Sequence, residues 1–452
     1  MQSKSVVSIV QNPEAPDAGR IREMVREAIT LTRPVEEYVK PGNTVVIKVN
    51  IFAPYPPPVS ADRRVIAALV RICKDAGASR VVVIEGVSVG TKQSRGYSSM
   101  DNMILLGIKT AVEEAGGEVA AIDDTERVLV DVPSAFILHQ IHYPKIMLEA
   151  DVLIDLACLK THAMTMVTLG IKNFQGILSD EERYEGHRDD LPQHLVDLHR
   201  VRKPDLTIID GLIGMEGNGA GEQGMPVPMN LILAGADVVA VDAVSSAIMG
   251  IEDPLDVQTT RLAAYAGLGT ADLGSIEVVG KSIAEVQRKF ILPLTFSKYL
   301  DRFVTGMWPN IRTYISGACP MCWMLAAVIS FDLAMKPAQW TMIIGVDPKL
   351  PPNFDGDLDH VIIFGDCAMA ATGRVKELRN KMLLERKGVL GEGCPPYRPL
   401  EAKIAEQLVK LGYVDPEAMQ VKFKKTQARL FQYYSEIDPT WKPEELKIKD
   451  NR

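Results

Sequence analysis

Four of the six cysteines in this 452-residue chain lie in its C-terminal third, with a spacing that suits a metal centre. Cys319 and Cys322 form a Cys-x-x-Cys pair, Cys367 follows an apolar run, and Cys394 lies in a loop rich in glycine and proline. A Cys-x-x-Cys pair in a turn lets two thiolates reach one metal, and two further cysteines complete a four-thiolate site. We therefore expect these four residues to bind one centre.

Three kinds of centre remain open on the spacing alone. An iron–sulfur cluster held by all four cysteines is favoured because proline follows Cys394, as in ferredoxin-type ligand loops. A structural zinc site is the second alternative, although such sites usually have two tight Cys-x-x-Cys pairs. The third is a redox-active or structural Cys-x-x-Cys pair with two unrelated cysteines. The remaining Cys73 and Cys158 suit small, buried hydrophobic positions.

Two lysines and a histidine in the first half of the chain could bind a small anion and move a proton. Lys160 and His162 follow an apolar run that we predict to be a strand, and Lys172 comes shortly afterwards. Ligands of open α/β folds bind beyond the carboxyl ends of the strands, so these candidate catalytic side chains would face one cleft. They suit a carboxylate, phosphate or enolate. The alternative is a structural loop with surface lysines. The histidines nearby lack metal-ligand spacing and are expected to be solvated: His187, His194 and His199.

Further polar residues at predicted strand ends would line the same crevice as substrate contacts. Lys48 and Asn50 end one apolar run, Asn173 follows Lys172, and Glu216 and Asn218 lie beyond another run. Any one of them also fits a structural role. Their repetition at strand ends is what favours a binding crevice.

The glycine-rich stretch 219–224 matches the pattern G-x-G-x-x-G, but we do not interpret it as a dinucleotide site. That fingerprint needs a helix to begin at once, so that the helix N-terminus can hold the pyrophosphate. Here prolines and a predicted strand follow. A loop that closes over a ligand, with Glu216 and Asn218 as polar contacts, is the favoured interpretation.

These side chains need a scaffold, and the chain pattern predicts a layered α/β fold whose mostly parallel or mixed sheet is flanked by helices. Short β-rich runs alternate with helical stretches, and several runs are continuously apolar, which is typical of strands buried on both faces of a sheet. The predicted strands are Val6–Val10, Thr44–Val49, Arg80–Glu85, Glu118–Ile122, Val128–Val132, Val152–Leu156, Leu206–Ile209, Leu231–Ala234, Ile276–Val279, Thr341–Val346 and Val361–Phe364. The predicted helices are Gly19–Leu31, Arg64–Ala76, Asn102–Ala115, Pro192–Val201 and Asp237–Met249.

We divide the chain into an α/β domain at residues 1–280, a connector at 281–316 and a cysteine-bearing region at 317–452. The connector interrupts the alternation with prolines and aromatic residues. The C-terminal region is expected to be a smaller α+β unit. Its final segment has the pattern of charged amphipathic helices, which we interpret as a solvated appendage.

Composition narrows the classes of partner and the cellular compartment. Acidic residues (58) and basic residues (50) are mixed along the chain, which gives no reason to expect nucleic acid or an anionic membrane as a partner. No signal peptide and no apolar stretch of membrane-spanning length is evident. Six cysteines are too sparse for a disulfide framework. We therefore expect a cytoplasmic protein.

Taken as a set, the motifs from about residue 40 to residue 280 resemble the family known as domain of unknown function 362 (DUF362). The motifs that carry the resemblance are Lys48-Val49-Asn50, Ala150-Asp151-Val152-Leu153-Ile154-Asp155-Leu156, Leu159-Lys160-Thr161-His162, Gly170-Ile171-Lys172-Asn173, Lys203-Pro204-Asp205-Leu206-Thr207-Ile208-Ile209-Asp210-Gly211, Glu216-Gly217-Asn218-Gly219 and Asp237-Val238-Val239-Ala240-Val241-Asp242-Ala243. Members of that family are often associated with iron–sulfur centres, sometimes through a ferredoxin domain. The resemblance thus implies such a centre here. This chain has dispersed cysteines in place of ferredoxin ligand runs, so one [4Fe-4S] cluster is the most that it supports.

The expectation that follows is an iron–sulfur-dependent oxidoreductase, or an electron-transfer-linked enzyme, acting on a small anionic substrate in the Lys/His-lined cleft. A ferredoxin-like protein would be its electron donor, and zinc is the alternative to the cluster. A non-redox lyase or isomerase on a carboxylate, with the cluster as Lewis acid, is the first alternative. A non-enzymatic, metal-dependent docking or carrier protein is the second. A homo-oligomer stays open.

Overall fold

The computed structural model divides the chain into two compact units. It describes residues 4–86, 97–179, 182–183, 185–186, 190–221, 223–296, 304–334, 336–354, 356–394, 404, 406–410, 412 and 416–444. Among these, the first unit comprises the residues up to 292 and those from 427 onward, and the second comprises residues 293–426. The expected boundaries at 280 and 316 therefore differ from the units observed, and the C-terminal segment belongs to the first unit.

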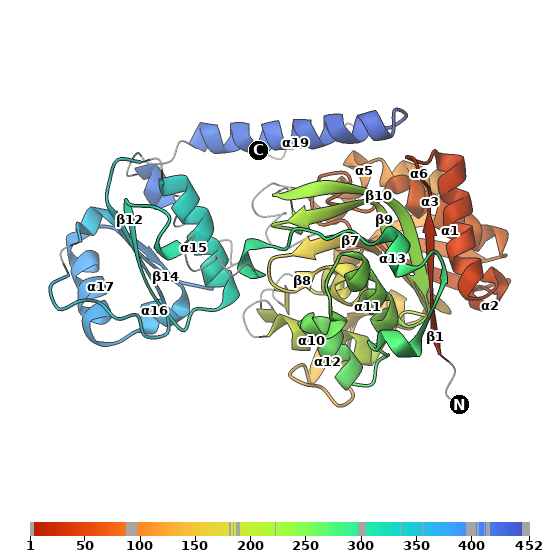
Figure 1. Cartoon of the computed structure of the whole chain (residues 1–452), viewed down its shortest axis with the longest axis horizontal. Helices are drawn as coiled ribbons and strands as arrows, with labels where there is room; N and C mark the ends of the chain where they lie inside the picture. Colours follow the sequence, from red (N-terminus) through yellow and green to blue (C-terminus); the bar gives the residue numbers. More distant parts are fainter. Residues whose placement is uncertain are drawn as a thin grey trace. The chain divides into compact units, whose positions relative to one another are not determined.

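A mixed sheet is the centre of the first unit, with the strand order β11-β1-β10-β9-β7-β2-β3-β4 and with β8 paired to β7 (Figure 1). The strands are β1 (Ser5–Gln11), β2 (Thr44–Lys48), β3 (Arg80–Glu85), β4 (Glu118–Ala121), β7 (Val152–His162), β8 (Met166–Val167), β9 (Leu206–Gly217), β10 (Gly224–Gly235) and β11 (Ile276–Gly280). Strands β4, β3, β2, β7 and β9 pair in parallel, so their carboxyl ends meet at one edge. Strand β10 is antiparallel to both β9 and β1. A separate hairpin joins β5 (Arg127–Asp131) and β6 (Gln140–Pro144).

Helices cover both faces of this sheet. The helices are α1 (Ala18–Thr32), α2 (Val35–Tyr38), α3 (Arg63–Asp75), α5 (Ser99–Leu105), α6 (Ile108–Glu114), α7 (Lys145–Leu148), α8 (Leu169–Asn173), α10 (Leu191–Val201), α11 (Val238–Ile248), α12 (Gln258–Tyr265) and α13 (Ile283–Val286). On β2, Val45 and Ile47 pack into the core beneath α1 and α3, and Val46 packs into the core beneath α8 and α11. Burial on both faces explains the continuously apolar strands and confirms the α/β layered fold. Within the described ranges, no helix has the length and apolarity needed to cross a membrane.

A smaller parallel sheet is the centre of the second unit, with the order β12-β13-β14-β15. Its strands are β12 (Ile311–Ser316), β13 (Trp340–Gly345), β14 (Val361–Phe364) and β15 (Val389–Gly391), and its helices are α15 (Pro320–Leu333), α16 (Asp366–Ala370) and α17 (Gly373–Glu385). Residues of α15 pack against one face of the sheet and residues of α17 against the other. Single-turn 3-10 helices connect elements in both units: η1 (Ile122–Asp124), η2 (Phe174–Ile177), η3 (Pro254–Asp256), η4 (Leu273–Ser275), η5 (Leu294–Phe296) and η6 (Leu358–His360).

The predicted strands are all present, and the differences have local causes. Strand β12 lies in the segment expected to be a connector. The expected helix at 102–115 is instead two helices, α5 and α6, because Gly107 between them has φ +67°, a left-handed conformation that interrupts a helix.

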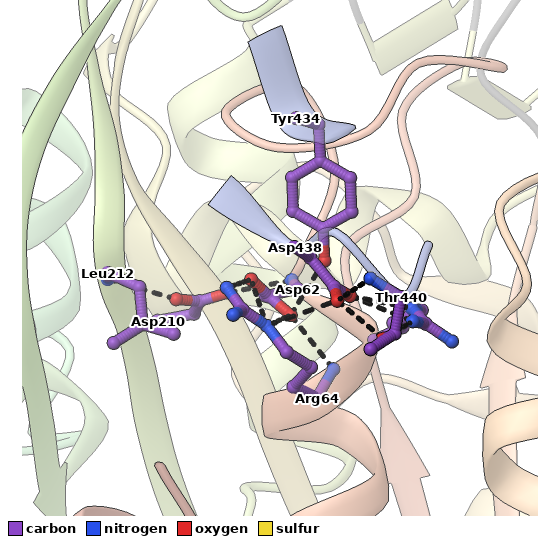
Figure 2. Close-up of polar contacts among 8 residues, drawn as sticks. Asp62, Arg64, Asp210, Leu212, Tyr434, Asp438 and Thr440 are labelled. Carbon is purple, nitrogen blue, oxygen red and sulfur yellow. Dashed lines mark hydrogen bonds and ion pairs between the residues drawn. The ribbon is translucent and has the colours of Figure 1, made fainter. Parts of the chain in front are cut away.

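The expected solvated appendage at the C-terminus is wrong for residues 427–444. Helix α19 (Pro416–Ile437) ends in a buried polar network around Asp62, the N-cap of α3 (Figure 2). The Tyr434 hydroxyl donates to Asp62 Oδ1 at 2.9 Å, and Arg63 pairs with Asp438 at 2.8 Å. The Trp441 ring packs against Tyr434 with its centroid 5.2 Å away and is only 2% exposed. This segment therefore completes the core of the first unit.

We expect Trp441→Ala to lower the free energy of unfolding by about 3–5 kcal/mol, because it removes a large buried aromatic side chain. It also removes the bond from Trp441 Nε1 to the Leu106 carbonyl, which is 3.0 Å long. Urea denaturation followed by circular dichroism measures the change. The matched control is Tyr265→Ala, since Tyr265 is 82% exposed. A loss no larger than that of the control would show that this segment is not part of the core.

Candidate functional site

The carboxyl ends of β3, β2 and β7 bring polar residues from distant parts of the chain together. Lys48 at the end of β2 is the register partner of Asp155 on β7 and of Ile84 on β3. Glu85 follows Ile84, and its Oε1 lies 2.9 Å from Lys48 Nζ. Of the predicted site residues, Lys48, Asn50, Lys160 and Asn173 are connected here by hydrogen bonds.

Asn173, the last residue of α8, ties these strands to each other. Its Oδ1 accepts hydrogen bonds from Lys48 Nζ (3.3 Å) and from Asn50 Nδ2 (2.9 Å). Its Nδ2 donates to Asp155 Oδ1 (2.7 Å) and to the Leu156 carbonyl (3.2 Å). The amide is therefore satisfied on both sides, and its role in this arrangement is to fix its neighbours.

Lys48 is committed to contacts within the protein. Its ammonium donates to the Val49 carbonyl at 2.7 Å, pairs with Glu85 and reaches Asn173, which accounts for its three N–H groups. The Glu85 carboxylate also accepts from the backbone N–H of Ile51 and of Gly86, both at 2.8 Å. Lys48 and Glu85 thus form a buried, satisfied ion pair.

Lys160 is held by neutral groups. Its Nζ donates to Asn50 Oδ1 and to the Val59 carbonyl, each at 2.7 Å, and lies 5.7 Å from the centre of the Phe52 ring. Two of its three N–H groups are thereby used, and both acceptors are uncharged oxygens. Burial lowers the pKa of Lys160 to about 8.

Lys172 has no hydrogen bond or ion pair with any residue that the structure describes, although it is only 9% exposed. Burial is the largest cause that lowers its pKa to about 7, and the positive charges of Lys160 and Lys48 lower it further. A lysine in this state exchanges a proton near neutral pH. Lys172 is therefore the residue of this group that is best placed to react.

The position of Lys172 is set by contacts to the backbone of the short helix α8. Asp242 on α11 is buried, and its carboxylate accepts hydrogen bonds from Gly170 N (2.8 Å) and Ile171 N (3.0 Å) at the start of α8. His199 on α10 contacts the Ile171 carbonyl through Nε2 (3.1 Å) and stacks on Phe174. These contacts fix the two residues that precede Lys172.

The expectation that the histidines near α10 are solvated is therefore wrong for two of them. His199 is 1% exposed and His194 is 4% exposed. Both lie on the face of α10 that contributes to the core beside α8, a face that the polar composition of the helix concealed. His187 lies outside the described residues.

His162 lies at the end of β7 with its Nδ1 turned to the backbone. This nitrogen accepts from Met164 N (3.1 Å) and from Thr165 N (3.3 Å). Since both donors are N–H groups, the neutral ring carries its hydrogen on Nε2. His162 is thus held through Nδ1 at the end of β7, as the tautomer with its hydrogen on Nε2.

Glu216 and Asn218, the two predicted substrate contacts on β9 and just after it, lie apart from the hydrogen-bonded group around Asn173. Glu216 Oε2 accepts from the backbone N–H of Ile291 at 2.9 Å, and Arg288 lies 3.7 Å from Glu216 Oε1, so this carboxylate holds the segment after α13. Asn218 is exposed in the turn that follows β9. Strand β10 begins at Gly224, so no helix follows the glycine-rich stretch, as predicted.

Two buried carboxyl groups that were not singled out from the sequence lie among these residues, Asp155 and Asp242. Burial raises the pKa of Asp155 to about 7, and its Oδ2 has no hydrogen-bond partner among the described residues. Burial also raises the pKa of Asp242 well above its usual range. An acidic residue inside a strongly apolar run, such as Asp155 in β7 and Asp242 in α11, is the signal that points to them.

In the second unit, the four cysteines follow three strands of the parallel sheet. Cys319 is the N-cap of α15 and Cys322 lies in its first turn, both after β12. Cys367 lies in α16 after β14, and Cys394 follows β15. Since the strands are parallel, these cysteines lie at one edge of the sheet. Cys73 and Cys158 are buried in the first unit, as predicted.

The four thiols lie near one another. Cys319 forms a hydrogen bond with Cys322 and raises its pKa, and burial and the negative charges of Cys394 and Cys367 raise it further. A Cβ added at Gly365 would lie 3.3 Å from Cys322 Sγ, so glycine lets the chain approach this sulfur. In the described part of the chain, no three His, Cys, Asp or Glu side chains are close enough to hold a metal ion. The donor set fits a four-thiolate centre, and the thiols would have to draw together to form it.

Comparison with known proteins finds a family whose sequence model matches part of this chain. Residues 45–247 match the sequence model of the domain of unknown function DUF362. The thylakoid-associated protein sll1697 of Synechocystis sp. (strain ATCC 27184 / PCC 6803 / Kazusa) is 27% identical over 274 residues, which are 58% of this chain and 79% of that protein. The lactate racemase apoprotein from Thermoanaerobacterium thermosaccharolyticum aligns over 90% of this chain and 82% of its own, with 12% identity and a TM-score of 0.38, too low to support a conclusion. The resemblance inferred from the motifs is thus confirmed, and residues 45–247 of this chain match the DUF362 family.

Proposed function

We propose that this protein is an enzyme that binds a small anionic substrate at the carboxyl ends of β2 and β7, between Lys160 and Lys172. The observation that carries the proposal is a surplus of positive charge with unused donors. Lys160 donates to two carbonyl oxygens and has one N–H left, and Lys172 has no partner among the described residues. A buried cation is costly without an anion, so a carboxylate or phosphate would relieve this site.

The same lysines can serve as acid and base. With pKa values of about 7 and about 8, Lys172 and Lys160 both populate charged and neutral forms near neutral pH. His162 at the end of β7 is the third side chain that we propose for this site. Binding an anion would raise the pKa of both lysines, because the opposite charge favours the ammonium form.

The finer proposal is that the enzyme is an iron–sulfur oxidoreductase, or one linked to electron transfer. Cys319, Cys322, Cys367 and Cys394 would hold one [4Fe-4S] cluster, which supplies one-electron transfer when bound. Their gathering at one edge of a parallel sheet and their mutual effect on the pKa of Cys322 support this assignment. Zinc remains the alternative metal.

The partners and the compartment follow from that cofactor. A cluster that is oxidised in each catalytic cycle must be reduced again, and we propose a ferredoxin-like protein as its electron donor. Cysteines that serve as metal ligands suit a reducing compartment, and we propose the cytoplasm.

A non-redox lyase or isomerase acting on a carboxylate is the second candidate function. The near-neutral pKa of Lys172 favours it, because such enzymes take a proton from carbon with a base tuned to neutral pH. Reduction of the substrate when a reductant is supplied would favour the oxidoreductase over the lyase or isomerase. A metal-dependent docking or carrier protein remains the non-enzymatic alternative, and it predicts no role for Lys172.

Oxalate is a suitable probe of the proposed anion site, and isothermal titration calorimetry measures its binding. We expect Lys172→Ala to weaken binding by about tenfold or more, which is about 1.4 kcal/mol. Affinity should fall as the pH rises from about 6 to about 9, because Lys172 and Lys160 lose their charge in this range.

Lys40→Ala is the control for this experiment, since Lys40 is exposed and remote from α8 in the sequence. It should leave oxalate affinity unchanged. Equal affinity in Lys172→Ala and the unsubstituted protein, or affinity that does not depend on pH, would contradict the anion site.

The cofactor proposal predicts about four iron and four sulfide per chain after anaerobic purification. Serine at Cys319, Cys322, Cys367 or Cys394 should lower both contents and the visible absorbance, because each removes a thiolate ligand. Cys73→Ala should retain the cluster, since Cys73 is buried in α3. A preparation with stoichiometric zinc and no sulfide would show that the centre is not an iron–sulfur cluster.

A further inference from the structure

The three lysines at this site differ in how many of their N–H groups are used. Lys48 uses three, Lys160 uses two, and Lys172 uses none with the described residues. All three are at least nine-tenths buried. Packing alone does not account for this gradient, because a cation on a side chain that is only 9% exposed destabilises the fold when the protein offers it no acceptor. The arrangement leaves the Lys172 amine without a partner in the described part of the chain, within reach of the charge of the firmly positioned Lys160.

We propose that Lys172 is a nucleophile that forms an imine with the carbonyl carbon of a small 2-oxo acid, whose carboxylate is held by the remaining N–H of Lys160. This inference rests on the proposed anion site and adds to it the substrate class and a covalent step.

The geometry of α8 suits a nucleophile. Asp242 holds the first turn of the helix through Gly170 N and Ile171 N. Asn173, the residue after Lys172, is anchored by its side chain to Asn50 beyond β2 and to Asp155 on β7. The backbone on both sides of Lys172 is thus fixed, while its amine has no competing contact with the described residues. A fixed backbone and an uncommitted amine allow attack on a bound carbonyl with little reorganisation.

The charges around Lys172 keep a fraction of its amine neutral, which imine formation requires. Its low pKa arises from burial and from the neighbouring cations Lys160 and Lys48, which is an established way to activate a lysine. A surface lysine with a pKa of about 10.4 is almost wholly protonated at neutral pH. Lys172 therefore has far more of the reactive form at the same pH.

The step is balanced without an oxidant or reductant. The amine lone pair of Lys172 attacks the carbonyl carbon, and the carbonyl oxygen takes up a proton to give a carbinolamine. Loss of water, whose hydrogens come from the amine, then leaves a carbon–nitrogen double bond. Protonation of that nitrogen gives an iminium, which draws electrons from the adjacent carbon and eases the removal of a proton from it.

The experiment traps the imine by reduction. The full-length protein is incubated with pyruvate and sodium cyanoborohydride near neutral pH, and the peptides are mapped by mass spectrometry. We expect a secondary amine at Lys172 that forms at least about tenfold faster than at exposed Lys40. Lys172→Arg should abolish this adduct. Lys160→Met should slow it, and should remove the preference for pyruvate over acetaldehyde, which lacks the carboxylate.

Modification of exposed lysines alone, or of Lys172 no faster than Lys40, would overturn the inference. Equal trapping of pyruvate and acetaldehyde by the unsubstituted protein would overturn the role given to Lys160. If no adduct forms while oxalate still binds in a Lys172-dependent manner, the imine is excluded and the proposed anion site stands. Circular dichroism of each variant confirms that it is folded before trapping.

Discussion

The polar site depends first on the side-chain amide of Asn173. It joins the end of β2, through Lys48 and Asn50, to β7, through Asp155 and Leu156. Asn50 in turn supplies one of the acceptors of Lys160, so the position of that lysine also depends on the amide. Loss of such an amide would leave several buried polar groups without partners, each at a cost of about 1–3 kcal/mol. One side chain thus connects the strand ends to the helix that carries Lys172.

The charged form of Lys172 lowers the free energy of unfolding. Its pKa is about 7 in the folded protein, well below the value of an exposed lysine, so the unfolded chain binds the proton more tightly. The destabilisation is fully present below about pH 7 and disappears as the pH rises toward about 10.4, where the unfolded chain also loses the proton. A fold that retains such a group in place of an apolar side chain is typical of a functional site.

The sequence allowed prediction of the parts of this site that follow from strand ends. Lys48, Asn50 and Lys160 come directly after or within apolar runs, and parallel strands bring such ends to one edge. The contacts of Asp242 and His199 with α8 could not be predicted, because they join elements far apart in the chain through backbone atoms. The contact of Glu216 could not be predicted for a similar reason, since its partner is a backbone N–H in a segment without regular structure. The same limit applies to the C-terminal segment, whose charged pattern concealed the few aromatic residues that enter the core.

The cysteines and the lysines belong to different units, and in each unit they lie at the carboxyl ends of parallel strands. The proposed chemistry depends most on Lys172, whose side chain is only 9% exposed, has no partner among the described residues and has a pKa of about 7. NMR titration of the side chains in protein labelled with isotopic lysine measures this directly. The account predicts one lysine resonance with a pKa of about 7, absent from Lys172→Arg and shifted upward by oxalate. A Lys172 resonance that titrates near 10.4, as an exposed lysine does, would contradict the account.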